Sequence, residues 1–255
     1  MPGRMRGLAP IAAVALALAA LLFAMPALAP LFAWGFPGVE PPVFAFQSFP
    51  LLFLDHAEIV AASSLAATAA GLALGIFVTR DAGAGFRAIV GAIATIGQTF
   101  PPVAVLAVAV PMLGYGDWPT FVALTLYGFL PIVANVIAGL ESVPDAVREA
   151  ALGIGYAPLR LLAEVELPLA APVILAGIRT SVVITIGTAT IGSTVGAVTL
   201  GTPIIDGLVG DKLPYVIEGA LVVALFAVLM DMIFDRIERR LRAPSAENDA
   251  TLERR

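Results

Sequence analysis

The chain has 255 residues, of which 60% are hydrophobic and 13% are charged, and its net charge is −5. A soluble domain carries roughly 25% charged residues, so this composition excludes an ordinary soluble protein and favours an all-α polytopic membrane protein. The acidic balance argues against nucleic acid as a partner, because such binding rests on basic patches. With no cysteine and one histidine, His56, the sequence excludes disulfides and thiolate metal sites, and that histidine alone cannot build a metal site.

Six apolar stretches predict about six transmembrane helices. In chain order they cover about residues 8–33, 56–79, 88–112, 119–140, 170–198 and 214–234. Pro101, Pro102 and Pro111 predict that the third span is kinked or divided into two pieces. The proline-containing residues 34–55 predict an external loop, and the polar residues 243–255 predict a disordered tail.

The first apolar stretch has two interpretations. Arg4 and Arg6, the apolar run and the residues Ala27-Leu28-Ala29 resemble a signal peptide with its cleavage site. The run is longer than the ~7–15 apolar residues of a typical signal peptide, which favours a retained span. We therefore expect residues 1–47 to form an additional span, or a signal-like segment, followed by an external loop.

The distribution of basic residues predicts the orientation. An N-terminus in the cytoplasm leaves only Lys212 outside, puts Arg179 within the fifth span, and places twelve arginines inside: Arg4, Arg6, Arg80, Arg87, Arg148, Arg160, Arg236, Arg239, Arg240, Arg242, Arg254 and Arg255. Because cytoplasmic loops are enriched in Lys and Arg, both termini are expected in the cytoplasm.

A charged segment separates the fourth and fifth spans. Within residues 141–168, Ser142 is a candidate cap and Pro144 suits the start of a helix. Gly153 and Gly155 predict a break, and Pro158 can open a second short helix. This pattern predicts a helix–turn–helix on the cytoplasmic face; an amphipathic interfacial connector is the simpler alternative.

The spacing within this segment resembles the EAA loop of bacterial ABC importer permeases. That family pattern reads E-A-A, three residues, G, nine residues, I-x-L-P, and this chain departs from it only by Val165 in place of isoleucine. The resemblance implies a coupling helix that docks on an ATPase subunit. The residues that carry it are Glu149, Ala150, Ala151, Gly155, Leu167 and Pro168.

Residues about 50–234 are similar to the permeases of osmoprotectant importers, which take up glycine betaine, carnitine, choline and related quaternary amines. The similarity rests on Gln98-Thr99 with Pro101, Leu130-Pro131 with Asn135, and residues 177–180 and 187–190. This chain departs from the usual G-A-G-G-L-G at residues 196–201, and its first span is an addition. The resemblance implies that residues 48–242 form the transmembrane domain of a multi-pass protein in the bacterial cytoplasmic (inner) membrane.

The resemblance also implies the partners. An ATPase dimer, a second permease subunit (identical or related) and a periplasmic or lipid-anchored substrate-binding protein would complete the importer. A phosphate-binding P-loop requires a Gly-Lys-[Ser/Thr] sequence, and the single lysine of this chain, Lys212, lies in GDKLP. The chain is therefore expected to be a transport subunit without enzyme activity or cofactor, with ATP and Mg bound by the partner ATPase.

Polar residues within the spans are candidates for the translocation path, because such residues face the bundle interior or a water-filled cavity. Those selected are Gln98, Thr99, Tyr127, Asn135, Thr188 and Thr190. Hydrogen bonding between helices is the alternative role for the threonines. Tyr115, Trp118 and Tyr127 could offer aromatic faces to a quaternary ammonium or form an interfacial belt. Arg179 is a candidate gate charge or a structural partner of Asp231 or Asp235.

Two other functions remain open on the sequence alone. The chain could be an ABC permease for another small, amino-acid-like solute, or an ion-coupled secondary carrier. A carrier usually needs a charged midplane site and repeated halves, neither of which the sequence displays. A membrane enzyme is disfavoured, because His56 has no visible partner set for catalysis.

Overall fold

The computed structural model describes residues 8–252, with side chains as far as Leu241, and every element that it describes is helical. Five helices are long and apolar enough to cross a membrane, and there are six if the pair α5–α6 counts as one span. The all-α, multi-span prediction is confirmed. The described chain divides into two compact units, which are considered one at a time below.

Unit 1 comprises residues Met1–Leu65, Phe100–Leu126 and Val182–Ile233, and unit 2 comprises Ala66–Thr99, Tyr127–Ser181 and Phe234–Arg255. The division falls within four long helices: α4 (Phe49–Val78), α7 (Asp117–Glu141), α10 (Leu167–Ala189) and α12 (Leu213–Leu252). It also separates α5 (Arg87–Gly97) from α6 (Pro102–Leu113). Each long helix therefore contributes residues to both units.

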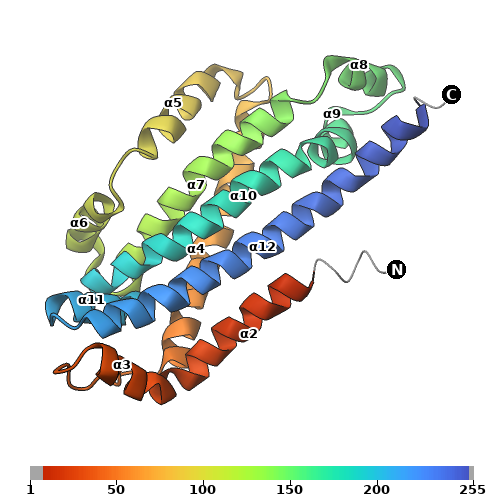
Figure 1. Cartoon of the computed structure of the whole chain (residues 1–255). Coiled ribbons are helices and arrows are strands. Elements are labelled where there is room, and N and C mark those ends of the chain that lie inside the picture. The colour runs from red at the N-terminus through yellow and green to blue at the C-terminus, as the bar shows by residue number, and fades with distance from the viewer. Residues whose placement is uncertain (1–7, 253–255) are drawn as a thin grey trace. The chain divides into compact units, whose positions relative to one another are not determined.

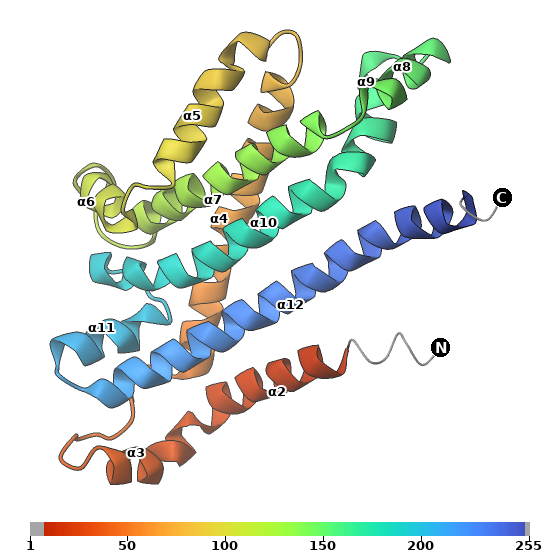
Figure 2. The ribbon, with the colours of Figure 1, turned by 45° about the horizontal axis from the view of Figure 1, so that its top comes forward.

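In unit 1, the first apolar stretch is a helix in three pieces. These are α2 (Ala9–Ala24), a 3₁₀ turn at Met25–Leu28 and α3 (Ala29–Gly35), which follow one another in Figure 2. Each piece has a proline in its first turn, where the missing N–H breaks no helical hydrogen bond. Together they form one candidate span, Ala9–Gly35.

The second span begins earlier than the sequence predicts. The helix α4 starts at Phe49, whereas the expected start lay near residue 56. Pro50 lies in its first turn, a position that accepts proline for the reason given above. The predicted loop is correspondingly shorter.

The loop at residues 36–48 is tied to the start of α12 within unit 1. The backbone N–H of Phe44 donates to the Glu218 carboxylate at 3.0 Å, and the Tyr215 hydroxyl donates to the Pro41 carbonyl at 3.1 Å. The rings of Phe44 and Tyr215 meet edge to face, with centroids 5.5 Å apart. These contacts order a stretch that the sequence identifies only as a proline-rich loop.

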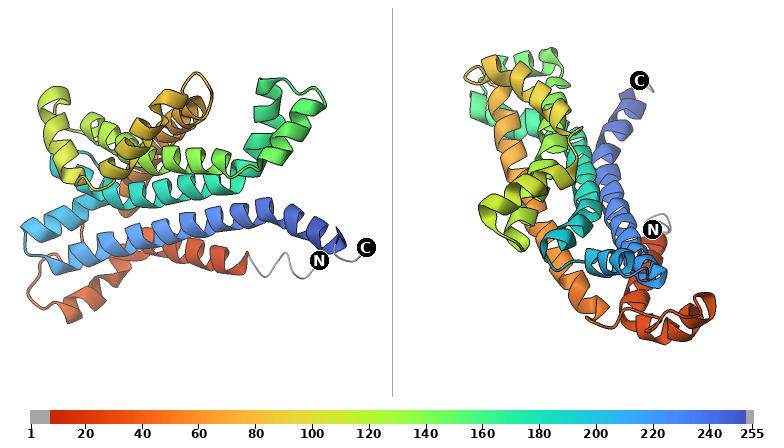
Figure 3. Two further views of the ribbon diagram at one scale, coloured as in Figure 1. Left: turned by 90° about the horizontal axis from the view of Figure 1, so that it is seen from above. Right: turned by 90° about the vertical axis from the view of Figure 1, so that its left-hand side faces the viewer.

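A short helix in unit 1 was not predicted. After α10, a 3₁₀ turn at Thr190–Val195 leads to α11 (Gly201–Val209), which turns back onto the start of α12 (Figure 3). A Cβ added to Gly207 would lie 2.8 Å from a Val216 methyl, so the two helices approach closely here. The expected fifth span, residues 170–198, therefore covers α10 from Ala170 onward and this 3₁₀ turn.

The third expected span is two helices, as its prolines predict. α5 ends at Gly97 and α6 begins at Pro102, with Pro101 in an extended conformation between them. Consecutive prolines remove two backbone donors and disfavour helical geometry at the preceding residue. The division is thus a direct consequence of Pro101-Pro102.

The predicted helix–turn–helix lies in unit 2. It consists of α8 (Asp145–Gly153) and α9 (Pro158–Leu161), and a π-helical turn at Leu162–Glu166 leads from it into α10 (Figure 1). Pro144, which was expected in the first helical turn, is the residue immediately before α8, in an extended conformation. The capping role predicted for Ser142 is wrong, because its hydroxyl donates to the Gly139 carbonyl at the end of α7 (2.7 Å).

Small residues allow α4 and α7 to approach closely in the core of unit 2. The core contains Ala67 of α4 and, from α7 and α10, Ile132, Val136, Leu140, Ala170 and Ile174. A Cβ on Gly71 would lie 2.6 Å from an Ile132 methyl, and one on Gly75 would lie 2.5 Å from a Val136 methyl. Ala67, Gly71 and Gly75 therefore form a small-residue face of α4 that packs on α7.

Two predictions concern the ends of the chain. α12 runs to Leu252 and so includes the first part of the tail expected at residues 243–255, whereas residues 253–255 lie outside the described part. Residues 1–7 also lie outside it. The predicted tail and the retained first span stay predictions.

The close packing of α4 on α7 leads to a stability prediction. Gly75→Ala should lower the free energy of unfolding by roughly 1–3 kcal/mol, because the new methyl overlaps Val136 and forces the two helices apart. Thermal denaturation of the detergent-solubilised protein measures the change. The matched control is Gly91→Ala in α5, where a Cβ meets no atom within 4 Å. Equal midpoints for the two variants would contradict the packing argument.

Candidate functional site

The α8–α9 segment, residues 145–161, bends at a glycine. Gly155 has φ +93°, a conformation that side chains rarely adopt, and a Cβ there would meet no atom within 4 Å. Glycine at this position is therefore required by the backbone turn and not by crowding within the chain. The break that the sequence predicts at Gly155 is thus a turn in the left-handed region of backbone conformation.

Most of the motif residues in α8 face outward. Glu149 and Ala150 are exposed, while Ala151 is buried against the rest of unit 2. Three apolar side chains of the segment are also exposed: Leu152 (51%), Ile154 (78%) and Leu159 (81%). Apolar side chains exposed in this way are available for contact with a protein partner or with the membrane surface.

The other end of the motif contains a buried carboxylate. Glu166 lies in the π-helical turn before α10, and its side chain is only 3% exposed. It accepts hydrogen bonds from Arg80 Nη1 at 2.6 Å and from Arg148 Nε at 2.8 Å. Arg80 follows the end of α4 and Arg148 lies on α8, so one carboxylate joins three parts of unit 2.

The guanidinium of Arg148 donates hydrogen bonds to three partners. Besides Glu166, it donates to the Asp145 carboxylate at 2.9 Å and to the backbone carbonyl of Leu140 in α7. Burial alone would lower the pKa of Arg148, but the hydrogen bonds to Glu166 and Asp145 outweigh it and raise that pKa above its ordinary value. The group stays charged and holds α8 against the end of α7.

Other arginines of unit 2 pair in the same way. Arg87, at the start of α5, lies 2.6 Å from Glu141 at the end of α7. Arg179 of α10 lies 3.5 Å from Asp235 and 3.4 Å from Glu238, both on α12. Asp235 is one of the two partners that we predicted for Arg179. Glu238 was not predicted as a partner; it lies one helical turn beyond Asp235 on the same helix.

The path candidates of unit 2 form hydrogen bonds within their own helices. Gln98 donates to the Ala94 carbonyl at 3.0 Å, Thr99 to the Ile96 carbonyl at 2.7 Å and Asn135 to the Pro131 carbonyl at 2.8 Å. Tyr127 is buried. Asn135 also faces Gly177 of α10, where an added Cβ would overlap it. Close packing on α10 is therefore an established role of Asn135.

The remaining candidates, Thr188 and Thr190, belong to unit 1. The Thr190 hydroxyl donates to the Gly187 carbonyl at 2.7 Å, and Thr188 is partly exposed. The six path candidates are thus divided between the two units. Their role in a path stays a prediction.

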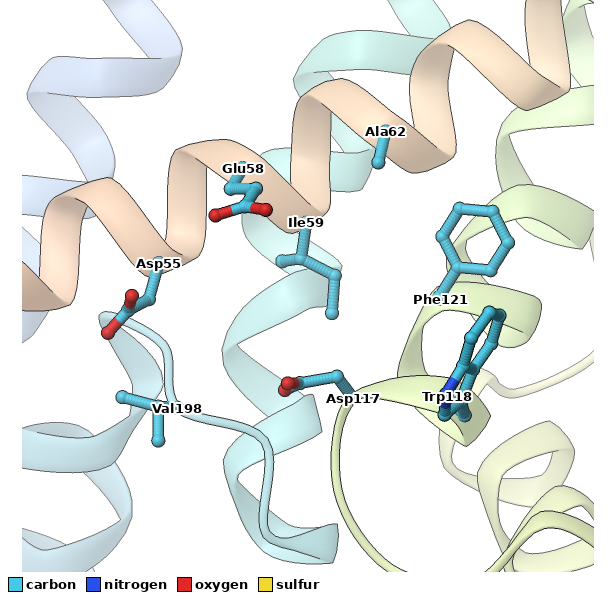
Figure 4. Close-up of a pocket in the computed structure, with 8 residues that line it drawn as sticks. All are labelled: Asp55, Glu58, Ile59, Ala62, Asp117, Trp118, Phe121 and Val198. Carbon is cyan, nitrogen blue, oxygen red and sulfur yellow. The ribbon is translucent and has the colours of Figure 1, made fainter.

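Unit 1 contains a cavity that the sequence did not predict (Figure 4). Its volume is about 450 Å³, and its walls come from α4, from α7 and from the loop after α10. The lining residues are Asp55, Glu58, Ile59, Ala62, Asp117, Trp118, Phe121 and Val198. The rings of Trp118 and Phe121 meet edge to face, with centroids 6.0 Å apart.

The cavity combines negative charge with aromatic surface. Asp55, Glu58 and Asp117 have no ion-pair partner among the residues whose side chains the structure describes. Trp118 was considered in the sequence as an aromatic contact for a cation. The three carboxylates were missed, because acids at the ends of spans are usually solvated, and only the fold brings α4 and α7 together around one space. Such a cavity suits a cation of moderate size.

A metal centre has no support in this region or elsewhere in the described part of the chain. No group of three or more His, Asp or Glu side chains there could hold an ion. The functional features are therefore the α8–α9 segment with its anchor at Glu166 and the acidic cavity of unit 1.

Curated proteins of similar sequence are permease subunits. The chain is 42% identical over 213 residues to the osmoprotectant import permease protein OsmY of Salmonella typhimurium, covering 83% of this chain and 89% of that protein. It is 40% identical to the choline transport system permease protein OpuBB of Bacillus subtilis, covering 73% of this chain and 85% of that protein.

The fold matches solved structures as well. The inward-facing MetNI methionine ABC transporter aligns with a TM-score of 0.66 at 23% identity, over 74% of this chain and 93% of the matched chain. A match at this identity shows that the fold is shared. Finally, the family model described as "binding-protein-dependent transport system inner membrane component" matches residues 71–243. This range contains the α8–α9 segment, Arg80 and Glu166, and the chain belongs to that family of multi-pass membrane proteins.

Proposed function

We propose that the chain is the pore-forming permease subunit of an ATP-driven importer for a quaternary amine osmoprotectant. The observation that carries this proposal is the sequence similarity to permeases that are named for osmoprotectant import and choline transport, over most of their length. ATP is hydrolysed by a separate subunit in this family. Family membership removes the support for an ion-coupled carrier.

The importer requires three further components. An ATPase dimer would bind the α8–α9 segment, and a second permease subunit, identical or related, would complete the pore. A periplasmic or lipid-anchored binding protein would deliver the substrate. The orientation follows the distribution of arginines, with both termini and the α8–α9 segment in the cytoplasm of a bacterial inner membrane.

The α8–α9 segment has the properties of a docking surface. Its exposed apolar side chains Leu152, Ile154 and Leu159 offer contact area, and the exposed Glu149 offers charge to a basic group of the ATPase. The left-handed Gly155 sets the bend between the two helices. Leu167 and Pro168 then begin α10, so the docking surface leads directly into a span.

The cavity of unit 1 supports the substrate class. A quaternary ammonium has no N–H to donate, so its recognition depends on carboxylate charge and aromatic faces. Asp55, Glu58 and Asp117 supply the charge, and Trp118 with Phe121 supplies the aromatic surface. The proposal places the substrate cation in this cavity during passage. An amino-acid-like solute, the alternative substrate, would donate its N–H groups to the same carboxylates, and its own carboxylate, like that of glycine betaine, would have no cationic partner among the lining residues.

The orientation predicts the result of reporter fusions. Reporters placed after Arg87 and after Arg160 should be active in the cytoplasm, and one near Trp118 should be active outside, because twelve of the arginines then lie inside. Paired cytoplasmic and periplasmic reporters at each position provide the internal control. An external signal at Arg160 would rule out both the orientation and the docking assignment.

The docking surface predicts a loss of ATPase binding. Ile154→Asp and Leu159→Asp should each weaken co-purification of the ATPase by roughly thirtyfold at subsaturating concentration, since losing a central apolar contact costs about 2 kcal/mol or more. The control is Leu208→Asp in α11, which changes a similarly exposed leucine (64%) in unit 1. Normal ATPase binding by both the Ile154→Asp and the Leu159→Asp variants would exclude the docking role of this segment.

The cavity predicts a change in apparent substrate affinity. In the reconstituted importer, Asp117→Asn and Trp118→Ala should each raise the choline concentration for half-maximal uptake by about tenfold, the loss of roughly 1–2 kcal/mol of cation binding. Glycine betaine should respond less, because its own carboxylate is repelled by the acidic wall.

Two variants outside the cavity serve as controls. Asp81→Asn changes an acid far along the chain in unit 2, and Tyr115→Ala removes an exposed ring that does not line the cavity. Both should leave choline uptake unchanged. Equal half-maximal concentrations for cavity and control variants would exclude a role for the cavity in the substrate path.

A further inference from the structure

The α8–α9 segment has little apolar packing of its own to fix its position. In α8, Ala151 is the buried residue, and Leu161 is the buried residue of α9. With one buried residue in each helix, hydrophobic packing is too sparse to transmit a movement of this segment reliably to the spans. The contacts that hold α8 are instead ionic, and they converge on Glu166.

The geometry at Glu166 is specific. Its two carboxylate oxygens have different partners, Oε2 with Arg80 and Oε1 with Arg148. The carboxylate is buried at 3% exposure, whereas the side chains of Arg80 and Arg148 are 32% and 25% exposed. Removing this one charge leaves two guanidiniums facing each other without their shared anion, which is far less favourable than losing an exposed pair.

The three hydrogen bonds of Arg148 depend on the planar shape of its guanidinium group. It uses Nε for Glu166, Nη1 for Asp145 and Nη2 for the Leu140 carbonyl. A lysine ammonium is a single point and cannot reach these three acceptors in the same arrangement. Arg80, in contrast, gives Glu166 one hydrogen bond, which a lysine can replace.

We infer that Glu166 is a positioning residue for coupling: it joins α8 to the end of α4 and to the start of α10, so that a displacement of the docking surface moves these spans. This inference rests on the proposed function, and it adds a residue that does not touch the ATPase. Docking and transmission are then separate properties. Glu149, Ile154 and Leu159 serve the first, and Glu166 with Arg148 serves the second.

The test separates ATPase binding from transport. In the importer reconstituted with its ATPase and binding protein, Glu166→Gln should keep ATPase co-purification within about twofold of wild type and retain ATP hydrolysis. Solute uptake per ATP hydrolysed should fall by about tenfold, the effect of losing one charge-assisted hydrogen bond. A purely structural role would lower binding, hydrolysis and uptake together.

Neighbouring residues supply matched controls. Glu164 lies in the same turn, but its side chain is 50% exposed and pairs with Arg160 four positions away, so Glu164→Gln should leave the ratio of solute uptake to ATP hydrolysis unchanged. Arg148→Lys should lower the ratio as Glu166→Gln does, while Arg80→Lys should stay near wild type. If Glu166→Gln does not fold, Arg148→Lys decides the question, because it preserves the charge.

The outcomes are distinguishable. A wild-type complex that binds no ATPase, or transports no solute, would overturn the proposed function. A different result would overturn the role of Glu166 alone. In that case the wild-type complex transports normally, and the Glu166→Gln or Arg148→Lys variant has the same ratio of uptake to hydrolysis as the wild type. A tenfold lower ratio with intact ATPase binding supports it.

Discussion

The organisation of unit 2 depends on a buried carboxylate that has two cationic partners. Taking a charge out of water is costly, and the cost is offset only when the geometry satisfies every polar group. The Glu166 carboxylate meets this condition because Arg80 and Arg148 each donate to one of its oxygens, whereas Nε of Arg80 is buried without a hydrogen-bond partner among the described residues. An apolar side chain in its place would pack with similar area but would specify no direction. The ionic contact fixes which face of α8 meets the spans.

Close backbone approach supplies the second constraint in the same unit. Gly71 and Gly75 bring α4 against Ile132 and Val136 of α7, and Gly177 brings α10 against Asn135. In a membrane, helices gain little from the hydrophobic effect on associating, so packing through small residues is a principal source of cohesion. Helices packed in this way are stiff, and a stiff helix end is what the Glu166 contact needs in order to move a whole span.

The chemistry of unit 1 differs from that of unit 2. In this unit, three acids that have no ion-pair partner among the described side chains line a cavity beside two aromatic rings. Threonine and amide side chains in the spans, which looked like path residues, largely bond to carbonyls of their own helices. A hydroxyl bonded in this way is already satisfied in lipid and needs no water-filled path to explain it. The unpaired acids are the groups that remain to be explained by a ligand.

The sequence by itself determined the helical membrane architecture, the division at Pro101-Pro102 and the helix–turn–helix between residues 145 and 161, because these follow from local composition and backbone chemistry. It also carried the family resemblance, through the spacing of Glu149, Gly155 and Pro168. It missed α11 and the early start of α4, where neighbouring helices and the tolerance of proline in a first turn outweigh the local pattern. Only the tertiary structure decided that Glu166 pairs with Arg80, 86 positions away, and that acids of α4 and α7 share one cavity. Charge pairing depends on distance in space, and a linear sequence specifies the charges without specifying which of them the folded backbone brings within reach.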